Sequence, residues 1–510
     1  MAEREPAPRA APPAGRDTLP APPADTLREE VATDYLFQSE FDDEDIPAPW
    51  EAPADSLAKT PDFLPLEPDY QEPTYYPPVV ALETAPNVHQ VYEFQPGRIV
   101  PYRLKFRTEF VTTQLDNTQL FDGLNSYSGT PTDFGYPPPG ILFKANFKDL
   151  FEDYQFEGGL RLPTSFNGTE YFATFDNRKQ RLDKRYAFYR RALRFTGDPT
   201  PTALVPPKTE SQIVLGQYQL RYPLDIFRSV RATASLRFDR TIQLATDATT
   251  LNTPTIREKR AGLRLEYVFD NTLDVALNIK NGSRYKVYAE MVKRFNVQLG
   301  QNPDFNFEKG FMTILGFDAR HYQRVLKHSV LAGRLAGATS FGSEKILFFL
   351  GGTDGWLFQS FNQDIPQPFT TDFAYQTVSP HLRGFRYNIR NGNSFILTNV
   401  EFRLPLFRYL LPRTQSSFIR NFQLVGFFDG GTAWVGRSPY DKDSPLNTAI
   451  ISNPQVTVRV NYFRDPFVYS YGVGVRTMVF GYFIRLDYGW GVETRVQQPP
   501  RLHVSMGLDF

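Results

Sequence analysis

Polar and apolar residues alternate along most of this chain, most clearly at its C-terminal end. Two sets interleave over the last eight positions: His503, Ser505, Gly507 and Asp509 on one face, and Val504, Met506, Leu508 and Phe510 on the other. A period of two is typical of a β-strand with one apolar and one polar face. In a transmembrane β-barrel the apolar face contacts lipid and the polar face lines the lumen. The pattern therefore predicts a membrane-spanning strand that ends at Phe510.

The same period recurs far from the C-terminus. Apolar residues oppose polar or small ones in several runs: Leu104, Phe106 and Phe110 against Arg103, Lys105, Arg107 and Glu109; Leu263, Leu265, Tyr267 and Phe269 against Gly262, Arg264 and Glu266; and Ile484, Leu486, Tyr488 and Trp490 against Arg485, Asp487 and Gly489. A soluble β-sandwich also alternates, but strands of globular sheets are usually only about 5–6 residues long. Several runs here are longer, which favours an all-β fold, a transmembrane antiparallel β-barrel.

Seventeen segments from Arg98 onward are strand candidates. Their approximate centres are Phe106, Phe147, Gly158, Phe172, Phe188, Gln217, Ser235, Leu265, Tyr288, Ile314, Ala332, Phe348, Val400, Val425, Val475, Leu486 and Met506. Single-chain bacterial barrels have an even number of strands, so we expect sixteen and assign the surplus candidate to the rim of an early hairpin. Both chain ends then lie on the periplasmic side. The long connections 353–393 and 432–468 then lie on the external side of the membrane, and the connection 411–420 lies on the periplasmic side.

Residues 1–97 differ in composition from the rest of the chain. They hold eighteen of the 42 Pro and an acidic run from Glu40 to Asp45. Such a segment buries too little apolar surface to offset the entropy lost on ordering. We therefore expect a disordered linker over residues 1–97 and a barrel over residues 98–510.

Composition and charge narrow the function. The 45 Phe and 27 Tyr are enough for aromatic girdles at both membrane interfaces. The formal net charge is zero, which gives no reason to expect a nucleic-acid partner. With no Cys, disulfide and thiolate chemistry are excluded.

The residue pattern offers little support for an enzyme. The five His include no pair at a spacing that binds metal: His89, His321, His328, His381 and His503. An outer-membrane phospholipase needs Ser and His facing lipid, whereas His503 and Ser505 face inward by alternation. We expect no catalytic residues, no metal and no cofactor.

Six motifs occur in a fixed order toward the C-terminus: Gly351-Gly352-Thr353-Asp354, Leu382-Arg383-Gly384-Phe385, Asn399-Val400-Glu401-Phe402-Arg403-Leu404-Pro405, Phe427-Phe428-Asp429-Gly430-Gly431-Thr432-Ala433-Trp434, Gly472-Val473-Gly474-Val475-Arg476 and Arg485-Leu486-Asp487-Tyr488-Gly489, before the terminal Phe510. In the order and spacing of these motifs, the chain resembles the outer-membrane insertase and translocase superfamily that includes BamA and TamA. The barrel of this superfamily is also called the bacterial surface antigen barrel. The resemblance is dense from Gly310 to Phe510 and general before that.

The resemblance implies a sixteen-stranded barrel whose sixth external loop folds back into the lumen. The loop tip is Arg383, Gly384 and Phe385, and its acidic partners on the inner wall are Glu401 and Asp429. Independently, Glu401 faces the lumen by alternation, and Arg pairs with carboxylates through two hydrogen bonds. The alternative is a solvated external Arg beside unrelated acids. The sequence departs from the common family pattern in the length of this loop: 29 residues, Thr353 to His381, lie between Gly352 of the first motif and Leu382 of the second.

The N-terminal segment departs from BamA and TamA. Those proteins carry periplasmic polypeptide-transport-associated domains, and nothing in Met1 to Gln95 shows their alternation of helix and strand. The chain more closely resembles the superfamily branch in which a TolB-like propeller is fused to the barrel.

The function implied by the resemblance is insertion or translocation of polypeptides at the bacterial outer membrane. It includes a weak seam between the first and last strands, marked here by Phe106, Val504, Gly507 and Phe510, which opens sideways and pairs with an incoming strand. The partners implied are outer-membrane lipid, client polypeptides and accessory periplasmic proteins or lipoproteins. The alternative is a non-catalytic outer-membrane anchor or channel that lacks a client-binding module.

Overall fold

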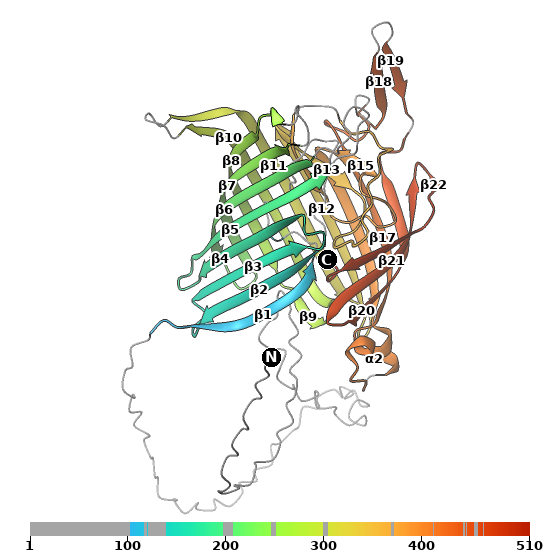
Figure 1. Ribbon diagram of the computed structural model, residues 1–510. Coiled ribbons are helices and arrows are strands. Elements are labelled where there is room, and N and C mark those ends of the chain that lie inside the picture. The colour runs from blue at the N-terminus through green and yellow to red at the C-terminus, as the bar shows by residue number, and fades with distance from the viewer. Residues whose placement is uncertain are drawn as a thin grey trace, which may run out of the picture. The chain divides into compact units, whose positions relative to one another are not determined.

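One long antiparallel sheet makes up most of the described chain (Figure 1). The computed structural model describes residues 103–116, 120, 139–196, 208–245, 251–298, 304–368, 372–411, 413–441, 444, 446–452, 457–462 and 464–510. The predicted disordered segment, residues 1–97, lies outside these ranges.

The sheet has eighteen strands, two of which are short, β9 (Leu273–Ala276) and β22 (Val496–Gln497). The other sixteen follow one another in chain order, each paired antiparallel with the next: β1 (Phe106–Asp116), β2 (Gly140–Asp149), β3 (Tyr154–Pro163), β4 (Gly168–Asn177), β5 (Asp183–Thr196), β6 (Lys208–Pro223), β7 (Arg228–Leu244), β8 (Ile256–Asp270), β10 (Ile279–Gln298), β11 (Asp304–Arg324), β12 (Val330–Gly342), β16 (Ser394–Leu404), β17 (Gln423–Trp434), β20 (Val468–Val479), β21 (Tyr482–Glu493) and β23 (Arg501–Met506). The predicted all-β antiparallel barrel of sixteen strands is confirmed.

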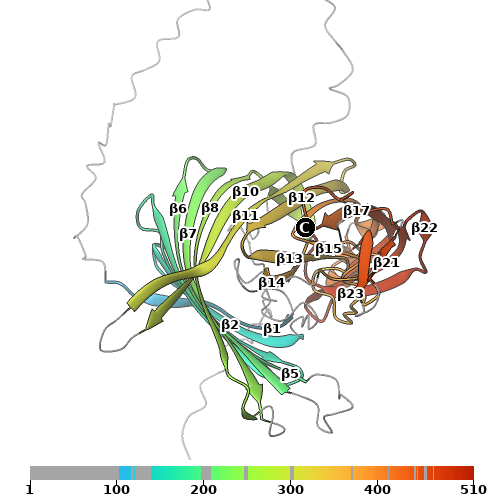
Figure 2. The ribbon, with the colours of Figure 1, turned by 90° about the horizontal axis from the view of Figure 1, so that it is seen from above.

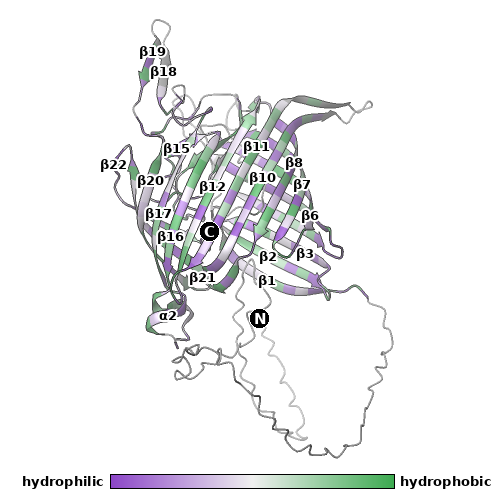
Figure 3. Cartoon of the chain, turned by 180° about the vertical axis from the view of Figure 1, so that it is seen from behind, coloured by the Kyte–Doolittle hydropathy of each residue, from purple (hydrophilic) through white to green (hydrophobic). Residues whose placement is uncertain are grey.

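The two faces of the sheet differ as the alternation predicts. On β7, Leu236 and Phe238 are exposed on the outer face, whereas Arg237 and Asp239 are buried on the inner face. Bands of hydrophobic and hydrophilic residues alternate along the strands in Figure 3. An apolar outer face suits lipid, and a charged inner face suits a lumen. In the described part of the chain, no helix is long and apolar enough to cross a membrane.

One predicted strand is not part of the barrel. The candidate centred on Phe348 is β13 (Lys345–Leu350), which pairs with β14 (Phe373–Val378) and β15 (Arg390–Gly392) in a separate small sheet. These three strands lie inside the ring of barrel strands (Figure 2). The surplus candidate was therefore this segment and not an early hairpin rim. Its continuous apolar run is buried on both faces, and its pairing with β14 is parallel, as is typical of such runs.

A β-bulge changes the face of Phe110. The register of β1 against β2 shifts between Thr108 and Phe110, so that Phe110 lies opposite Asn146 on the lumenal face. The Lys144 ammonium lies 5.3 Å from the centre of the Phe110 ring, on that same face. The prediction that Phe110 faces outward is therefore wrong, because an extra residue in one strand reverses the alternation beyond it.

The C-terminal strand ends earlier than predicted. β23 ends at Met506, and Gly507 has φ +100°, a conformation that favours glycine. The turn at Gly507 brings the last two residues inward, so Phe510 is buried among lumenal side chains instead of facing outward: Ile279, Tyr322, Val330 and Ala332. Phe510 therefore does not lie on the outer face near the seam.

The connections sort to the two ends of the barrel (Figure 1). The short helices α2 (Leu406–Leu410) and α3 (Ser417–Arg420) lie between β16 and β17 at one end. The hairpin of β18 (Thr448–Ser452) and β19 (Thr457–Asn461) extends from the other end. Residues 343–393 connect β12 to β16 and contain β13, β14 and β15; we call this segment the inner loop.

The two ends of the sheet are not paired with each other. Within the described ranges, no backbone pairing joins β1 to β23, although every other pair of neighbours in the row is paired. Residues 106–109 of β1 are exposed on both faces. The seam between the first and last strands is thus the one place in the described row where the sheet is not continuous.

Candidate functional site

The tip of the inner loop is bound to the inner wall of the barrel through Arg383. This side chain donates from Nε and Nη2 to Asp429 on β17, over 2.8 and 2.7 Å, and from Nη1 to Glu401 on β16, over 2.5 Å. The backbone nitrogen of Arg383 also donates to Asp429, at 3.1 Å. All three side chains are almost completely buried. The structure thus brings together the residues that the resemblance had placed in contact.

The surroundings of Arg383 keep its charge stable. Burial alone would lower the pKa of its guanidinium, but the carboxylates of Asp429 and Glu401 hold that pKa well above its usual value. The guanidinium carbon lies 3.9 Å from the centre of the Phe427 ring, which adds a cation–π contact. Asp487 of β21 is also near, with its Oδ1 3.6 Å from Nη1. A permanent cation on the loop therefore meets acids from three barrel strands.

Glycines let the next two tip residues approach the wall closely. Gly384, with φ +81°, donates its N–H to Nε2 of His503 on β23 over 3.0 Å. The ring of Phe385 packs over Gly491 of β21, where an added Cβ would lie only 2.4 Å from a ring carbon. The tip therefore touches β16, β17, β21 and β23 at once. These contacts connect the inner loop to four of the last barrel strands.

A second layer of ion pairs lies next to Arg383. Arg476 of β20 donates to Asp487 and to Asp509, each over 2.8 Å. Arg403 donates to Glu401 over 2.8 Å and to the carbonyl oxygen of Phe510 over 3.0 Å. The last two residues of the chain are thus held in the same charge network as the loop tip.

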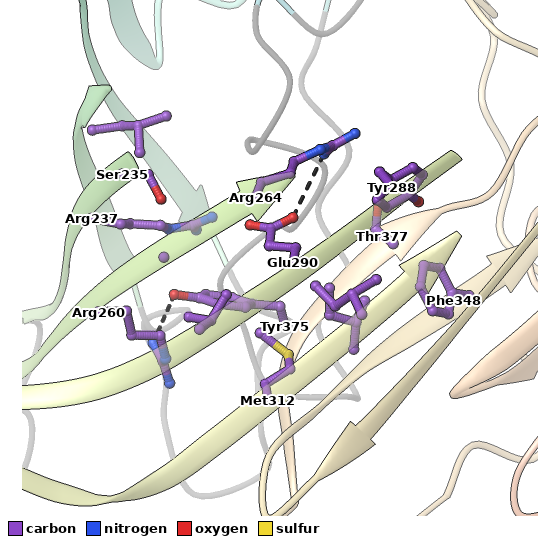
Figure 4. Close-up of a pocket in the computed structure, with 15 residues that line it drawn as sticks. Ser235, Arg237, Arg260, Arg264, Tyr288, Glu290, Met312, Phe348, Tyr375 and Thr377 are labelled. Atoms are coloured by element: carbon purple, nitrogen blue, oxygen red, sulfur yellow. Dashed lines mark hydrogen bonds and ion pairs between the residues drawn. The ribbon is translucent and has the colours of Figure 1, made fainter. Parts of the chain in front are cut away.

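The inner loop also contacts the opposite wall through Tyr375 of β14 (Figure 4). The Tyr375 hydroxyl accepts a hydrogen bond from Nη1 of Arg260 and donates one to Asp239, each over 2.9 Å. Its ring lies between two guanidinium groups, 4.2 Å from that of Arg237 and 4.5 Å from that of Arg260. The adjoining cavity, of about 60 Å³, has room for only a few water molecules. The inner loop therefore spans the lumen from β7 and β8 to β16 and β17.

The predicted seam residues are distributed differently. Phe106 lies on the first strand and Val504 on the last, as predicted, but these two residues are not paired with each other. Gly507 lies just beyond β23, and Phe510 is in the lumen. Tyr375 was not predicted, because it lies between the first two motifs and belongs to neither. Alternation could have identified Asp487, which shares the lumenal face of β21 with Arg485.

Across the described ranges, no group of three or more His, Asp or Glu side chains is placed to hold a metal ion.

Comparisons with known proteins find one matching family and several similar solved structures. Residues 255–510 match the Omp85 superfamily domain, and no curated protein matches the chain. Among solved structures, BamA from Haemophilus ducreyi lacking POTRA domains 1–3 is 11% identical, with a TM-score of 0.44, covering 79% of this chain and 71% of that one.

Two further solved structures are similar to this chain. CdiB from Acinetobacter baumannii is 11% identical, with a TM-score of 0.43, covering 79% of this chain and 60% of that one. CdiB from Escherichia coli is 12% identical, with a TM-score of 0.43, covering 80% and 63%. This chain thus spans less than two thirds of either CdiB chain. The family match extends over just over half of the 510 residues, and the chain therefore belongs to the Omp85 superfamily.

Proposed function

We propose that this protein inserts or translocates polypeptides at the bacterial outer membrane by opening the seam between β1 and β23. One observation carries the proposal: the described row of sixteen strands is paired throughout except between its first and last members. Within the described residues the outer edge of β1 has no paired strand, and such an edge presents N–H and C=O groups that can template another extended chain. Superfamily membership supports a role with client polypeptides and accessory periplasmic proteins or lipoproteins.

The charge network defines which parts move together. Arg383 joins β16 and β17, while Gly384 and Phe385 contact β23 and β21. Breaking one partner of a buried ion pair costs about 3–5 kcal/mol, so these last strands are expected to move as one unit. In the described residues no backbone pairing joins β1 to β23, so sideways opening between these two strands breaks no described hydrogen bond between them.

The proposal includes no catalytic step. Nε2 of His503 accepts the Gly384 N–H, which supports a structural role for this residue. The assignment to the branch fused to a TolB-like propeller rests on residues 1–95, outside the described ranges, and stays a prediction.

The proposal is tested by reconstituting the full chain in vesicles of bacterial outer-membrane lipids. The assembly of an unfolded eight-stranded barrel client is followed by heat-modifiable mobility and by protection from protease. Assembly faster than in protein-free vesicles supports insertion. An unchanged assembly rate contradicts the proposal and favours the anchor or channel, which ion conductance across the same vesicles then separates.

A further inference from the structure

The outer edge of β23, which faces the seam, is occupied by a segment of the inner loop. Leu357 donates its backbone N–H to the carbonyl oxygen of Val504 over 2.9 Å, and Met506 donates to that of Gly355 over 3.1 Å. Trp356 and Ser505 are opposite each other in an antiparallel bridge. We call Gly355–Leu357 the edge cap. It pairs with β23 in the way a neighbouring strand would.

The side chains of the edge cap fit this position closely. Trp356 is buried, with its ring centre 4.6 Å from that of His503 and 5.3 Å from that of Tyr387. Gly355 has φ +66°, and a Cβ at this position would lie 2.1 Å from the carbonyl oxygen of Met506. Only glycine permits so close an approach. The contact is therefore built from both backbone and side-chain features.

The edge cap is also tied to the tip of the inner loop. Gly352 donates to the carbonyl oxygen of Phe385 over 3.2 Å and accepts from Leu382 over 3.0 Å. Asp354 directly precedes the edge cap, and its backbone carbonyl accepts a hydrogen bond from the side chain of Arg485 on β21. Displacement of the cap is therefore coupled to the loop that carries Arg383.

The location of the cap in the sequence gives the extra residues a role. Gly355–Leu357 lies inside Thr353 to His381, the stretch whose length was identified from the sequence as a departure from the resemblance. An open strand edge invites pairing with other chains, and covering it with a loop is one way to prevent this. By contrast, no described residue pairs with the outer edge of β1.

We propose that the edge cap is an internal substitute strand that blocks the β23 edge until an extended polypeptide displaces it. The interaction surface is the outer backbone edge of Val504–Met506, and its partner is a strand with alternating polar and apolar residues. Identifying that strand as a client rests on the proposed function. The blocking of the edge does not.

The test uses the full chain in detergent micelles and a labelled peptide that copies residues 103–116, the sequence of β1. Leu357→Pro removes the donor to Val504, because proline has no N–H, and Trp356→Ala removes the buried ring. Phe358→Ala is the matched control, because Phe358 is an exposed apolar residue of the same loop. Heat-modifiable mobility verifies that each variant is folded.

The proposal predicts that peptide affinity rises about tenfold or more in Leu357→Pro and Trp356→Ala, since the competing hydrogen bonds or packing are lost. Phe358→Ala binds the peptide as the wild type does. Amide exchange at Met506 rises in the two cap variants without peptide and falls again with it. Unchanged peptide affinity in both folded cap variants overturns the proposal, whatever the exchange at Met506.

Failure of the edge-cap proposal can be distinguished from failure of the proposed function. If cap variants bind the peptide more tightly while the wild type fails to assemble a client, the edge cap stands and the insertase proposal fails. If client assembly proceeds while cap variants bind no more tightly, the insertase proposal stands and the edge cap is overturned.

Discussion

Arg383 donates three hydrogen bonds to Asp429, from its backbone nitrogen, Nε and Nη2, over 3.1, 2.8 and 2.7 Å. A lysine has a single terminal nitrogen and cannot reproduce the planar pair of side-chain contacts. The position of the loop tip is thus specified by the geometry of one side chain as well as by its charge.

Replacing Arg383 separates charge from geometry. Arg383→Ala leaves Asp429 without its charged partner and Glu401 with Arg403 alone, and we expect the free energy of unfolding to fall by up to about 3–5 kcal/mol. Arg383→Lys restores the charge and only part of the loss. The measurement is protection of residues 378–393 from protease and amide exchange. Full protection in Arg383→Lys would show that the two-bond geometry is not required.

Packing of Phe385 against the wall is tested at Gly491. A methyl group added there meets the Phe385 ring at 2.4 Å, so Gly491→Ala should displace the tip and cost about 1–3 kcal/mol of stability. Gly426→Ala on β17 is the control, because an added Cβ there meets nothing within 4 Å. Resistance to heat denaturation in detergent measures both variants. Equal effects of the two substitutions would mean that the Phe385 contact is unimportant.

The second anchor of the inner loop is tested at Tyr375. Tyr375→Phe keeps the ring between Arg237 and Arg260 but removes the hydroxyl that bonds Arg260 and Asp239. Loss of a hydrogen bond between buried groups costs about 1–3 kcal/mol. Amide exchange should increase in β14 and remain unchanged at Arg383–Phe385. An equal increase at both places would show that the two anchors are not independent.

The barrel should fold without the N-terminal segment. Alternation begins at about residue 98, and the preceding residues are rich in Pro. Deletion of residues 1–95 should therefore leave a detergent-soluble protein whose mobility on a gel still changes on heating. Loss of the folded species would assign the segment a structural role.

Alternation was sufficient to predict most of the fold from the sequence, because side chains on a strand change face at every residue. It identified all sixteen barrel strands and the lumenal position of Glu401. It failed where the period is absent or interrupted. Phe348 lies in an apolar run without a period, and the bulge after Thr108 reverses the face of Phe110.

The candidate site was predictable only where alternation and family motifs coincide. Arg383 and Asp429 lie in such motifs, and the structure places them in contact. Tyr375 and Trp356 lie in the extra length of the inner loop, where neither signal is present. Their positions depend on tertiary contacts between residues more than 100 positions apart, such as that of Tyr375 with Arg260.

The most direct test of sideways opening is a disulfide across the seam. The chain has no native Cys, so Phe106→Cys combined with Val504→Cys can form only one disulfide, provided their Cα atoms come within about 7 Å. With cross-linking complete, we predict that client insertion into vesicles stops under oxidation and returns on reduction, while each single-Cys variant is indifferent to both. Undiminished insertion by the fully cross-linked protein would contradict lateral opening and favour the anchor or channel.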